Sequence, residues 1–287
     1  MAVPRLFRRI VEVYAQGGAI AVARQAKVKL RYVYARSTFR PHVIEKTLAG
    51  HRVPVAINNP FAQGWVEGRT EWPELVWVAE HFLRTGDVVI DCGANNGFTS
   101  MFFARCVGPT GRVIAFEPVP SNVADTYENL RLNAIGNVEL RPQAVGSYNG
   151  EAMMADTPNG ILGDSHGPHA IRVPMVRLDD ALRGVTPSFI KVDVEGYELD
   201  VLSGGAEILR RRPCLDVEVH PLYARDRRRH VEAVLDFLQA CQYELAAQPI
   251  PDGPIVPWDQ ASLSPARLAE SDVFNLFAEP RGVLSAR

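Results

Sequence analysis

From residue 74 onward, short apolar runs rich in β-branched residues alternate with helix-length amphipathic stretches. The apolar runs are 88–90, 112–116, 138–140, 189–192 and 215–219, with two late runs at 243–247 and 273–278. The stretches with helical spacing are 75–83, 98–106, 121–133, 198–210 and 228–241. Buried strands that alternate with helices predict a parallel sheet covered on both faces. We therefore expect a doubly wound α/β domain whose ligands lie at the carboxyl ends of its strands.

Two regions depart from this alternation. Residues 41–70 contain short apolar runs cut by Gly, Pro and Asn, which predicts a small sheet or a covering arm. Residues 151–176 are inserted between the third and fourth strands, and their two ends, 151–155 and 171–176, predict a hairpin insertion. Its tip, 156–169, is rich in Gly and Pro. A polar loop of this kind is either a binding loop or a plain mobile loop, and both alternatives stay open.

The charge is distributed unevenly along a chain of ordinary globular composition. Of the 287 residues, 47% are hydrophobic and 22% charged, which excludes collagen-like and wholly disordered chains. The formal net charge of -2 combines +8 in residues 1–40 with -10 in the remainder. We expect a basic helical N-terminal extension and covering arm over 1–70, followed by the α/β domain over 71–287. Residues 1–40 are either a structural arm, which can swap across a homodimer, or a surface for anionic lipid or a partner.

The cysteines and the N-terminus bear on cellular location. Cys92, Cys106, Cys214 and Cys241 are scattered without a C-x-x-C pair, which favours a reducing compartment over a disulfide framework. Charged residues within 5–12 interrupt the apolar core that a signal peptide needs, and no run of 18 apolar residues predicts a transmembrane helix. We expect a cytoplasmic protein, with a peripheral membrane contact left open.

The strongest chemical signal is a glycine-rich turn, Asp91 to Gly97, directly after the first strand and before a helix. Its glycines let a ligand approach the backbone, and the helix start presents unpaired N–H groups. The spacing of Gly93 and Gly97 differs from the dinucleotide pattern G-x-G-x-x-G, which argues against a dehydrogenase. Glu117 ends the second strand, where nucleoside-binding folds carry a ribose-binding carboxylate. Together these features predict a nucleoside cofactor.

A second group of polar residues follows the fourth and fifth strands. Asp193 and Glu195 lie two residues apart, so their side chains point the same way, and Glu218 and His220 repeat this pattern. Two neighbouring carboxylates raise one pKa, which suits proton abstraction or metal binding. Glu195 has an alternative role as a cap of the following helix. The oxygen and imidazole groups suit either a general base or a divalent ion such as Mg²⁺.

These residues resemble the class I S-adenosylmethionine-dependent methyltransferases, and more closely the FkbM-type methyltransferases. The matching segments, within roughly residues 70–280, are VVIDCGANNGFTS (88–100), VIAFEPVPSNVADTYENLRLN (113–133), VPMVRLDD (173–180), FIKVDVEGYELDVLSGG (189–205) and LDVEVH (215–220). The resemblance implies a Rossmann-like, mostly parallel seven-stranded sheet with a helical N-terminal extension and a hairpin insertion. It also implies S-adenosylmethionine as the cofactor.

The resemblance further implies which residues hold that cofactor. The turn and Thr99 would hold the methionine part of the cofactor. Glu117 and Pro118 would flank its ribose and adenine. Gln143 and Ala144 would lie at the edge of the adenine. Glu71 matches an acid common in the family. The implied cofactor-binding set is Glu71, Asp91, Gly93, Ala94, Asn95, Gly97, Thr99, Glu117, Pro118, Gln143, Ala144 and Asp193.

The implied reaction is methylation of a hydroxyl on a sugar or secondary-metabolite acceptor. Catechol-type O-methyltransferases carry a lysine base just after the acid, but Gly196 occupies that position and Lys191 precedes it. The candidate catalytic residues are therefore Asp193, Glu195 and His220, with His220 as the base and Asp193 orienting cofactor and substrate. Metal dependence stays open.

Two alternatives to this reaction stay open, and a third is disfavoured. The chain can be a non-catalytic, cofactor-binding partner protein, or a methyltransferase for a lipid-linked or carrier-bound acceptor. Methylation of nucleobase amines is disfavoured, because the Asn/Asp-Pro-Pro-aromatic motif is replaced by Asp193-Val194-Glu195-Gly196. We therefore expect no nucleic-acid partner.

Overall fold

The computed structural model describes residues 37–155, 170–258 and 263–281. Within them, contacts divide the chain into a small unit, 37–42 with Ile57–Gly68, and a large unit, Val43–Ala56 with the described residues from Arg69 onward. Of the predicted basic helical segment 1–40, only residues 37–40 are described, and the tip of the insertion, 156–169, lies outside the described residues. The predicted domain boundary between residues 70 and 71 stays a prediction.

The small unit contains a single helical turn that continues into a π-helix. Helix α2 (Pro60–Ala62) begins with a proline, and the Asn59 side chain accepts a hydrogen bond from the Ala62 N–H at 2.8 Å. The π-helix Gln63–Glu67 follows directly. Both features fit the rules for helix starts, where proline and an Asn cap are favoured.

Residues 41–70 also supply the predicted small sheet. Strands β1 (His42–Leu48) and β2 (His51–Ile57) form a two-stranded sheet. The two residues between them, Ala49 and Gly50, have φ values of 45° and 79°. Positive φ at both loop positions is typical of the type I′ turn that matches the twist of a hairpin.

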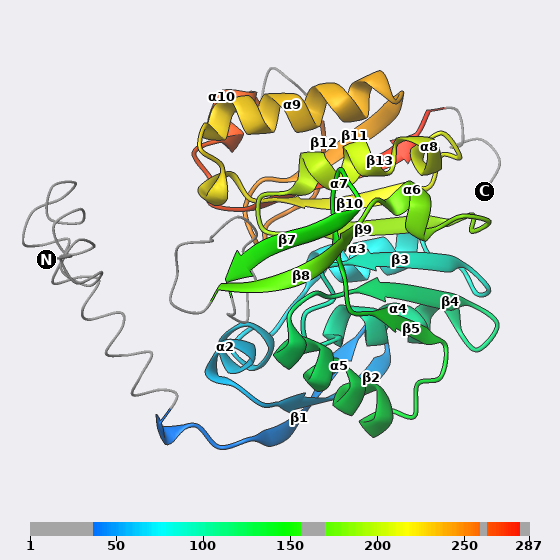
Figure 1. The fold of residues 1–287 in the computed structure, drawn as a ribbon, viewed down its shortest axis with the longest axis vertical. Coiled ribbons are helices and arrows are strands. Elements are labelled where there is room, and N and C mark those ends of the chain that lie inside the picture. Colours follow the sequence, from blue (N-terminus) through cyan, green and yellow to red (C-terminus); the bar gives the residue numbers. More distant parts are fainter. Residues whose placement is uncertain (1–36, 156–169, 259–262, 282–287) are drawn as a thin grey trace, which may run out of the picture. The chain divides into compact units, whose positions relative to one another are not determined.

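The large unit is built on a mostly parallel sheet, as predicted (Figure 1). Its strands are β3 (Val88–Cys92), β4 (Arg112–Phe116), β5 (Val138–Arg141), β9 (Phe189–Asp193), β10 (Cys214–Val219), β11 (Tyr243–Gln248), β12 (Val256–Pro257) and β13 (Phe274–Pro280). The order is β12-β11-β13-β10-β9-β3-β4-β5, with β10 to β5 parallel and the others antiparallel. All seven predicted strands are confirmed, and the two-residue β12 adds an eighth at the edge. The chain order reverses at β3, so the carboxyl ends of β3 and β9 form the switch point where such folds bind ligands.

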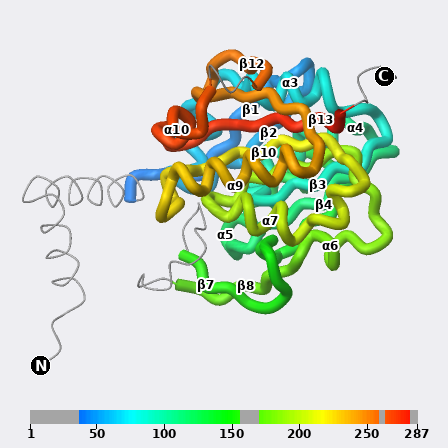
Figure 2. Tube along the Cα trace, turned by 90° about the horizontal axis from the view of Figure 1, so that it is seen from above, coloured from blue at the N-terminus to red at the C-terminus, as the bar shows by residue number. Residues whose placement is uncertain are grey.

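Helices cover both faces of this sheet (Figure 2). They are α3 (Pro73–His81), α4 (Phe98–Val107), α5 (Pro120–Leu132), α6 (Leu178–Ala181), α7 (Glu198–Gly204), α8 (Ala206–Leu209), α9 (Arg227–Ala240), α10 (Pro265–Leu268) and the 3₁₀-helix Pro221–Tyr223. Phe189 of β9 contacts Phe103 of α4, with ring centroids 5.5 Å apart. Its neighbour Ile190 belongs to the hydrophobic core that contains Leu202 of α7 and Leu235 of α9. The alternation of adjacent strand residues between two helical layers is what buries both faces. None of the described helices combines the length and apolarity that a membrane span requires.

The predicted single helix over 198–210 was wrong, because the structure has two helices, α7 and α8, separated at Gly205. Glycine is a poor helix former. In addition, a Cβ on Gly204 would lie 2.0 Å from the Gly146 carbonyl oxygen, so the backbone there packs too closely for any side chain. A distant segment of the chain therefore requires glycine at the last residue of α7.

The predicted hairpin insertion is confirmed. Strands β7 (Gly150–Ala155) and β8 (Ala170–Val176) pair antiparallel, and the short β6 (Ala144–Val145), which the sequence pattern did not indicate, pairs parallel with β8. These three strands form a separate sheet.

Candidate active site at the carboxyl ends of the strands

The glycine-rich turn after β3, Asp91 to Gly97, packs closely against the end of β9. Gly93 has φ +96°, and a Cβ on it would lie only 1.8 Å from the Asp193 carbonyl oxygen. The N–H groups of Gly93 and Ala94 both donate to the Phe116 carbonyl, at 2.9 and 3.0 Å. Gly97, with φ +82°, precedes α4 and provides no side-chain cap. The turn therefore connects β3, β4 and β9 at the switch point and leaves a helix start without a side-chain cap.

Glu117 ties the turn to the end of β4. Its side chain is 4% exposed, and its Oε2 accepts from the Asn95 N–H at 2.8 Å. Its Oε1 accepts from the Val119 N–H at 2.9 Å and from Asn122 Nδ2 at 3.2 Å. Burial raises the pKa of Glu117 to about 7, although these donors act in the opposite direction. Glu117 and the glycine turn, which the sequence predicted to act together, are therefore in direct contact through Asn95.

Two buried polar atoms beside the turn have no hydrogen-bond partner. Asp91 accepts from the Ser100 hydroxyl through Oδ2, but its Oδ1 is unpartnered, as is Asn96 Nδ2. Such groups are uncommon in native structures and call for an explanation such as a ligand or ordered water. An unpartnered acceptor and an unpartnered donor at one turn match the needs of an amino acid's ammonium and carboxylate groups.

The remaining predicted cofactor residues have different surroundings. Thr99 lies in the first turn of α4 and Ala144 in β6, and both are buried, whereas Pro118 and Gln143 are partly exposed. Glu71 is exposed and lines a cavity of about 490 Å³ that Trp72, Trp77 and Pro254 also line. The cofactor role of these residues stays a prediction.

The acidic cluster, which consists of Asp193, Glu195 and Glu218, is built on two adjacent parallel strands, β9 and β10. Asp193 of β9 is paired in register with Glu218 of β10, so their side chains share one face. Lys191 lies two residues before Asp193 and is 4% exposed. Its ammonium group donates to Asp193 Oδ2 at 3.1 Å and to Glu218 Oε2 at 3.2 Å. One buried cation thus holds one oxygen of each carboxylate.

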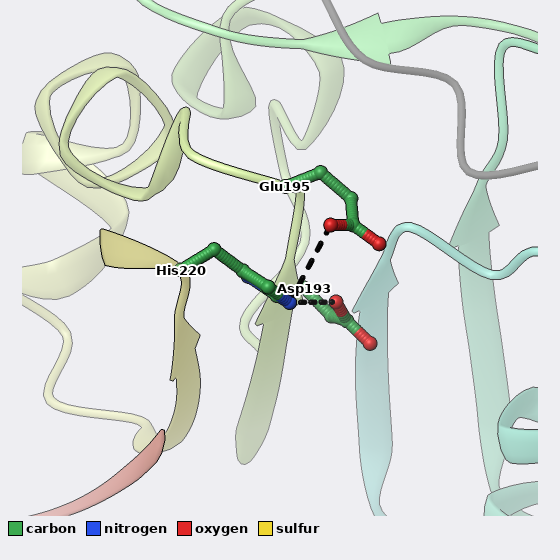
Figure 3. Close-up of side chains that lie close together, drawn as sticks. All are labelled: Asp193, Glu195 and His220. Carbon is green, nitrogen blue, oxygen red and sulfur yellow. Dashed lines mark ion pairs between the residues drawn. The ribbon is translucent and has the colours of Figure 1, made fainter. Parts of the chain in front are cut away.

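His220, which follows β10, faces the other side of the same carboxylates. Its Nε2 lies 3.8 Å from Asp193 Oδ1, 3.6 Å from Glu195 Oε2 and 3.8 Å from Glu218 Oε1. Figure 3 shows Asp193 and Glu195 turned toward this imidazole. Distances of this length are too long for hydrogen bonds. Nε2 and the three carboxylates thus face one another at these distances, and we call the space that they border the gap; oxygen and nitrogen atoms at this spacing suit a shared small ion or polar group.

The structure brings Asp193, Glu195 and His220 together, as the sequence predicted. The alternative role of Glu195 as a helix cap was wrong, because α7 begins at Glu198 and its N-cap position is Tyr197. Glu195 instead adopts a left-handed backbone conformation, φ +53°, which directs it to His220.

Protonation in the cluster is set by burial and by two cations. Burial raises the pKa of Asp193 to about 6, with a further contribution from Glu218, and raises the pKa of Glu195 to about 7. For Glu218 burial acts in the same direction, but Lys191 and His220 outweigh it and lower the pKa. For His220 burial opposes protonation, yet its hydrogen bond to Glu198 and the facing carboxylates raise the pKa to about 10.

Glu198 lies behind His220 and was missed by the sequence analysis. It is fully buried, and its Oε1 is 3.1 Å from His220 Nδ1 and 2.7 Å from the Gly196 N–H. Its Oε2 is 2.8 Å from His230 Nε2 of α9. No local spacing marks Glu198, because its two histidine partners come from other elements. Lys191, by contrast, could have been assigned to the cluster from its two-residue spacing to Asp193.

The same group has the donors for a divalent ion. Among the described residues, Asp193, Glu195 and His220 each offer one ligand atom, and these atoms lie within 4.8 Å of one another. Carboxylate oxygens and an imidazole nitrogen suit several divalent ions. The arrangement can thus either receive a proton or hold a cation at the gap.

Comparison with known proteins identifies several relatives. The methyltransferase FkbM domain matches residues 91–245. Methyltransferase sdnD of Sordaria araneosa is 28% identical over 161 residues, 42% of this chain and 61% of that protein. Hexuronic acid methyltransferase AglP of Haloferax volcanii is 31% identical over 143 residues, 47% of this chain and 56% of that protein. The matches thus span less than two thirds of these relatives.

Similarity to solved structures is more distant. An rRNA methylase from Streptococcus thermophilus has a TM-score of 0.43 at 17% identity, covering 72% of this chain and 94% of that one. An O-methyltransferase from Thermotoga maritima has a TM-score of 0.41 at 14% identity, and the match covers 83% of this chain and 77% of that one. These similarities are too low to assign a reaction. The FkbM match, however, spans more than half of the chain and includes both the glycine turn and the acidic cluster, so this chain belongs to the FkbM methyltransferase family.

Proposed function

We propose that this protein transfers a methyl group from S-adenosylmethionine to a hydroxyl group of a sugar or secondary-metabolite acceptor. The observation that carries the proposal is the gap between His220 Nε2 and the carboxylates of Asp193, Glu195 and Glu218. It lies at the end of β9, which the glycine turn touches at Asp193. Family membership supports methyl transfer, and the relative named for hexuronic acid supports a sugar acceptor.

The residues at the turn fit S-adenosylmethionine. Asp91 Oδ1 and Asn96 Nδ2, both buried and unpartnered, would bind the ammonium and carboxylate groups of its methionine part. The start of α4 adds N–H groups that favour a carboxylate. Glu117 uses three hydrogen bonds of the roughly four that a carboxylate accepts, which leaves capacity for one ribose hydroxyl.

The chain's own task is to align the acceptor oxygen and to receive its proton. When bound, S-adenosylmethionine supplies an electrophilic methyl group, and transfer to a hydroxyl releases one proton. Asp193, held by Lys191, and His220, held by Glu198, would orient a hydroxyl in the gap. The group that receives the proton must lie within reach of that hydroxyl and must be unprotonated beforehand.

Glu195 meets both conditions better than His220. Both groups border the gap, but the pKa of His220 is about 10, so near neutral pH its Nε2 already carries a proton. Burial raises the pKa of Glu195 to about 7, so it exchanges a proton in the range where cells operate. We therefore assign proton acceptance to Glu195 and orientation of the acceptor to His220, in place of the expectation that His220 is the base.

A divalent ion is the second arrangement that the donor set favours. Asp193, Glu195 and His220 would hold it. Such an ion supplies a Lewis acid that lowers the pKa of a bound hydroxyl. Assays in a metal-free buffer with a chelator, with and without added Mg²⁺, distinguish the two arrangements.

A product screen tests the proposal. The purified chain is incubated with S-adenosylmethionine and a panel of hexoses, hexuronic acids and hydroxylated polyketides, and formation of S-adenosylhomocysteine is followed. We expect an O-methyl product, identified by NMR, and loss of turnover in Asp193→Asn. The matched control is Asp200→Asn in α7, whose half-buried carboxylate accepts a hydrogen bond from the Ser147 hydroxyl. A product methylated on nitrogen or carbon contradicts the proposal. Cofactor binding without turnover supports a non-catalytic partner protein instead.

A further inference from the structure

Glu198 is a buried acid that lies outside the gap and contacts His220, which borders it. It begins α7, and no part of its side chain is exposed. Its two oxygens accept from the Gly196 N–H at 2.7 Å and contact the nitrogens of His220 and His230 at 3.1 and 2.8 Å. One carboxylate therefore joins the turn after β9, the end of β10 and helix α9.

The contact with Glu198 determines which nitrogen of His220 faces the gap. A buried carboxylate that is ionised can only accept hydrogen bonds, so the nitrogen next to it, Nδ1, carries a proton. The ring is then oriented with Nε2 toward the carboxylates of Asp193, Glu195 and Glu218. Rotating the ring by half a turn would remove the contact with Glu198 and would turn Nε2 away from the gap.

His230 reinforces this arrangement from a distant part of the chain. It contacts the oxygen of Glu198 that His220 does not use, so each oxygen has its own histidine. The carboxylate cannot rotate without losing one of these contacts. Its orientation is therefore determined by α9 as well as by its own helix.

We propose that Glu198 is a positioning residue for methyl transfer, which holds His220 with Nδ1 protonated and Nε2 directed into the gap. This inference rests on the proposed function for its kinetic consequence, but not for the geometry of His220. The same geometry serves either chemical arrangement at the gap. A histidine that orients an acceptor and one that binds an ion both need a partner on the second ring nitrogen.

The test compares Glu198→Gln with the matched variant Asp200→Asn of the same helix. Gln keeps the shape of Glu198 and removes its charge. We expect kcat to fall about 10- to 100-fold in Glu198→Gln, as for other residues behind a functional histidine, with the acceptor KM nearly unchanged. Asp200→Asn keeps the wild-type kcat. Binding of S-adenosylhomocysteine, measured by calorimetry, is unchanged in a correctly folded Glu198→Gln variant. A wild-type kcat in Glu198→Gln overturns the proposal.

A second measurement does not depend on turnover or on the variant. Nitrogen-15 NMR of histidine-labelled wild-type protein reports the protonation of each ring nitrogen, and the His220 signals are assigned by their loss in His220→Gln. We expect a protonated, hydrogen-bonded Nδ1 at His220 in the wild type. An unprotonated Nδ1 overturns the inference even if Glu198→Gln does not fold. If the wild type methylates no hydroxyl, the proposed function fails and this spectrum alone decides the inference.

Discussion

Glu117 and Glu198 are two buried glutamates near the carboxyl ends of the parallel strands, and they differ sharply in charge. Each takes part in three hydrogen bonds, and their exposed fractions are 4% and 0%. Burial raises the pKa of Glu117 to about 7. Burial acts in the same direction on Glu198, but the two histidines outweigh it and lower its pKa to about 2.

The difference lies in the donors rather than in their number. Glu117 is met by two backbone N–H groups and an amide, all neutral, which lower its pKa but do not offset the effect of burial. Glu198 is met by one backbone N–H and two imidazole rings that can carry positive charge. Glu117 can thus change its protonation when a polar ligand arrives, whereas Glu198 stays an anion. This division suits a binding residue and a positioning residue, respectively.

Removing the carboxylate of Glu198 gives the largest expected effect on stability. In Glu198→Ala the protonated His220 loses its buried counter-ion and His230 loses a hydrogen-bond partner, so we expect the free energy of unfolding at pH 7 to fall by about 3–5 kcal/mol. Urea titration followed by circular dichroism measures this loss. Asp200→Ala in the same helix is the control, with an expected change of about 1 kcal/mol from the loss of its hydrogen bond with Ser147. A similar loss in both variants would mean that helix packing, rather than the buried ion pairs, is responsible.

The pH dependence of stability has opposite signs at the two glutamates. The folded pKa of Glu117 is about 7, above the ordinary value of 4.5 for this side chain, so folding binds a proton. The contribution of Glu117 to stability therefore declines as pH rises from 4.5 to about 7. The stability difference between wild type and Glu117→Gln should therefore fall by up to about 3 kcal/mol between pH 4.5 and 8. The folded pKa of Glu198 is about 2, so its contribution is complete above pH 4.5 and declines toward pH 2. Unfolding curves measured between pH 2 and 8 test both signs. If the stability contributions of the two glutamates changed with pH in the same direction, the comparison would be refuted.

The contrast also separates what the sequence could predict from what it could not. The strands and the site residues Asp193, Glu195 and His220 were predictable, because the carboxyl ends of parallel strands meet at one edge of the sheet. The partnership of the turn with Glu117 was predictable for the same reason. These relations depend only on local spacing and on the order of the strands.

The environment of Glu198 depends on longer-range packing. His230 is 32 residues away and reaches Glu198 only because α9 packs beside α7. The need for glycine at Gly204, the end of α7, likewise comes from its close approach to Gly146, far away in the chain. Burial, and hence the charge of an acid, follows from the assembled core, so the pattern of a single segment does not reveal it.

The effect of Glu117 on cofactor affinity is the smallest of the expected changes. Glu117→Gln keeps the size of the side chain but removes a carboxylate that would accept a ribose hydroxyl. We expect the Kd for S-adenosylmethionine to rise about tenfold, or roughly 1.4 kcal/mol, as for one hydrogen bond to a charged group. Calorimetry at pH 8 makes the measurement, because the carboxylate is then mostly ionised above its pKa of about 7. At pH 6 the wild-type side chain is mostly protonated, so the difference between wild type and variant should shrink. An affinity difference that is equal at both pH values would mean that Glu117 acts through the shape of the turn, which it also holds at Asn95, rather than through its charge.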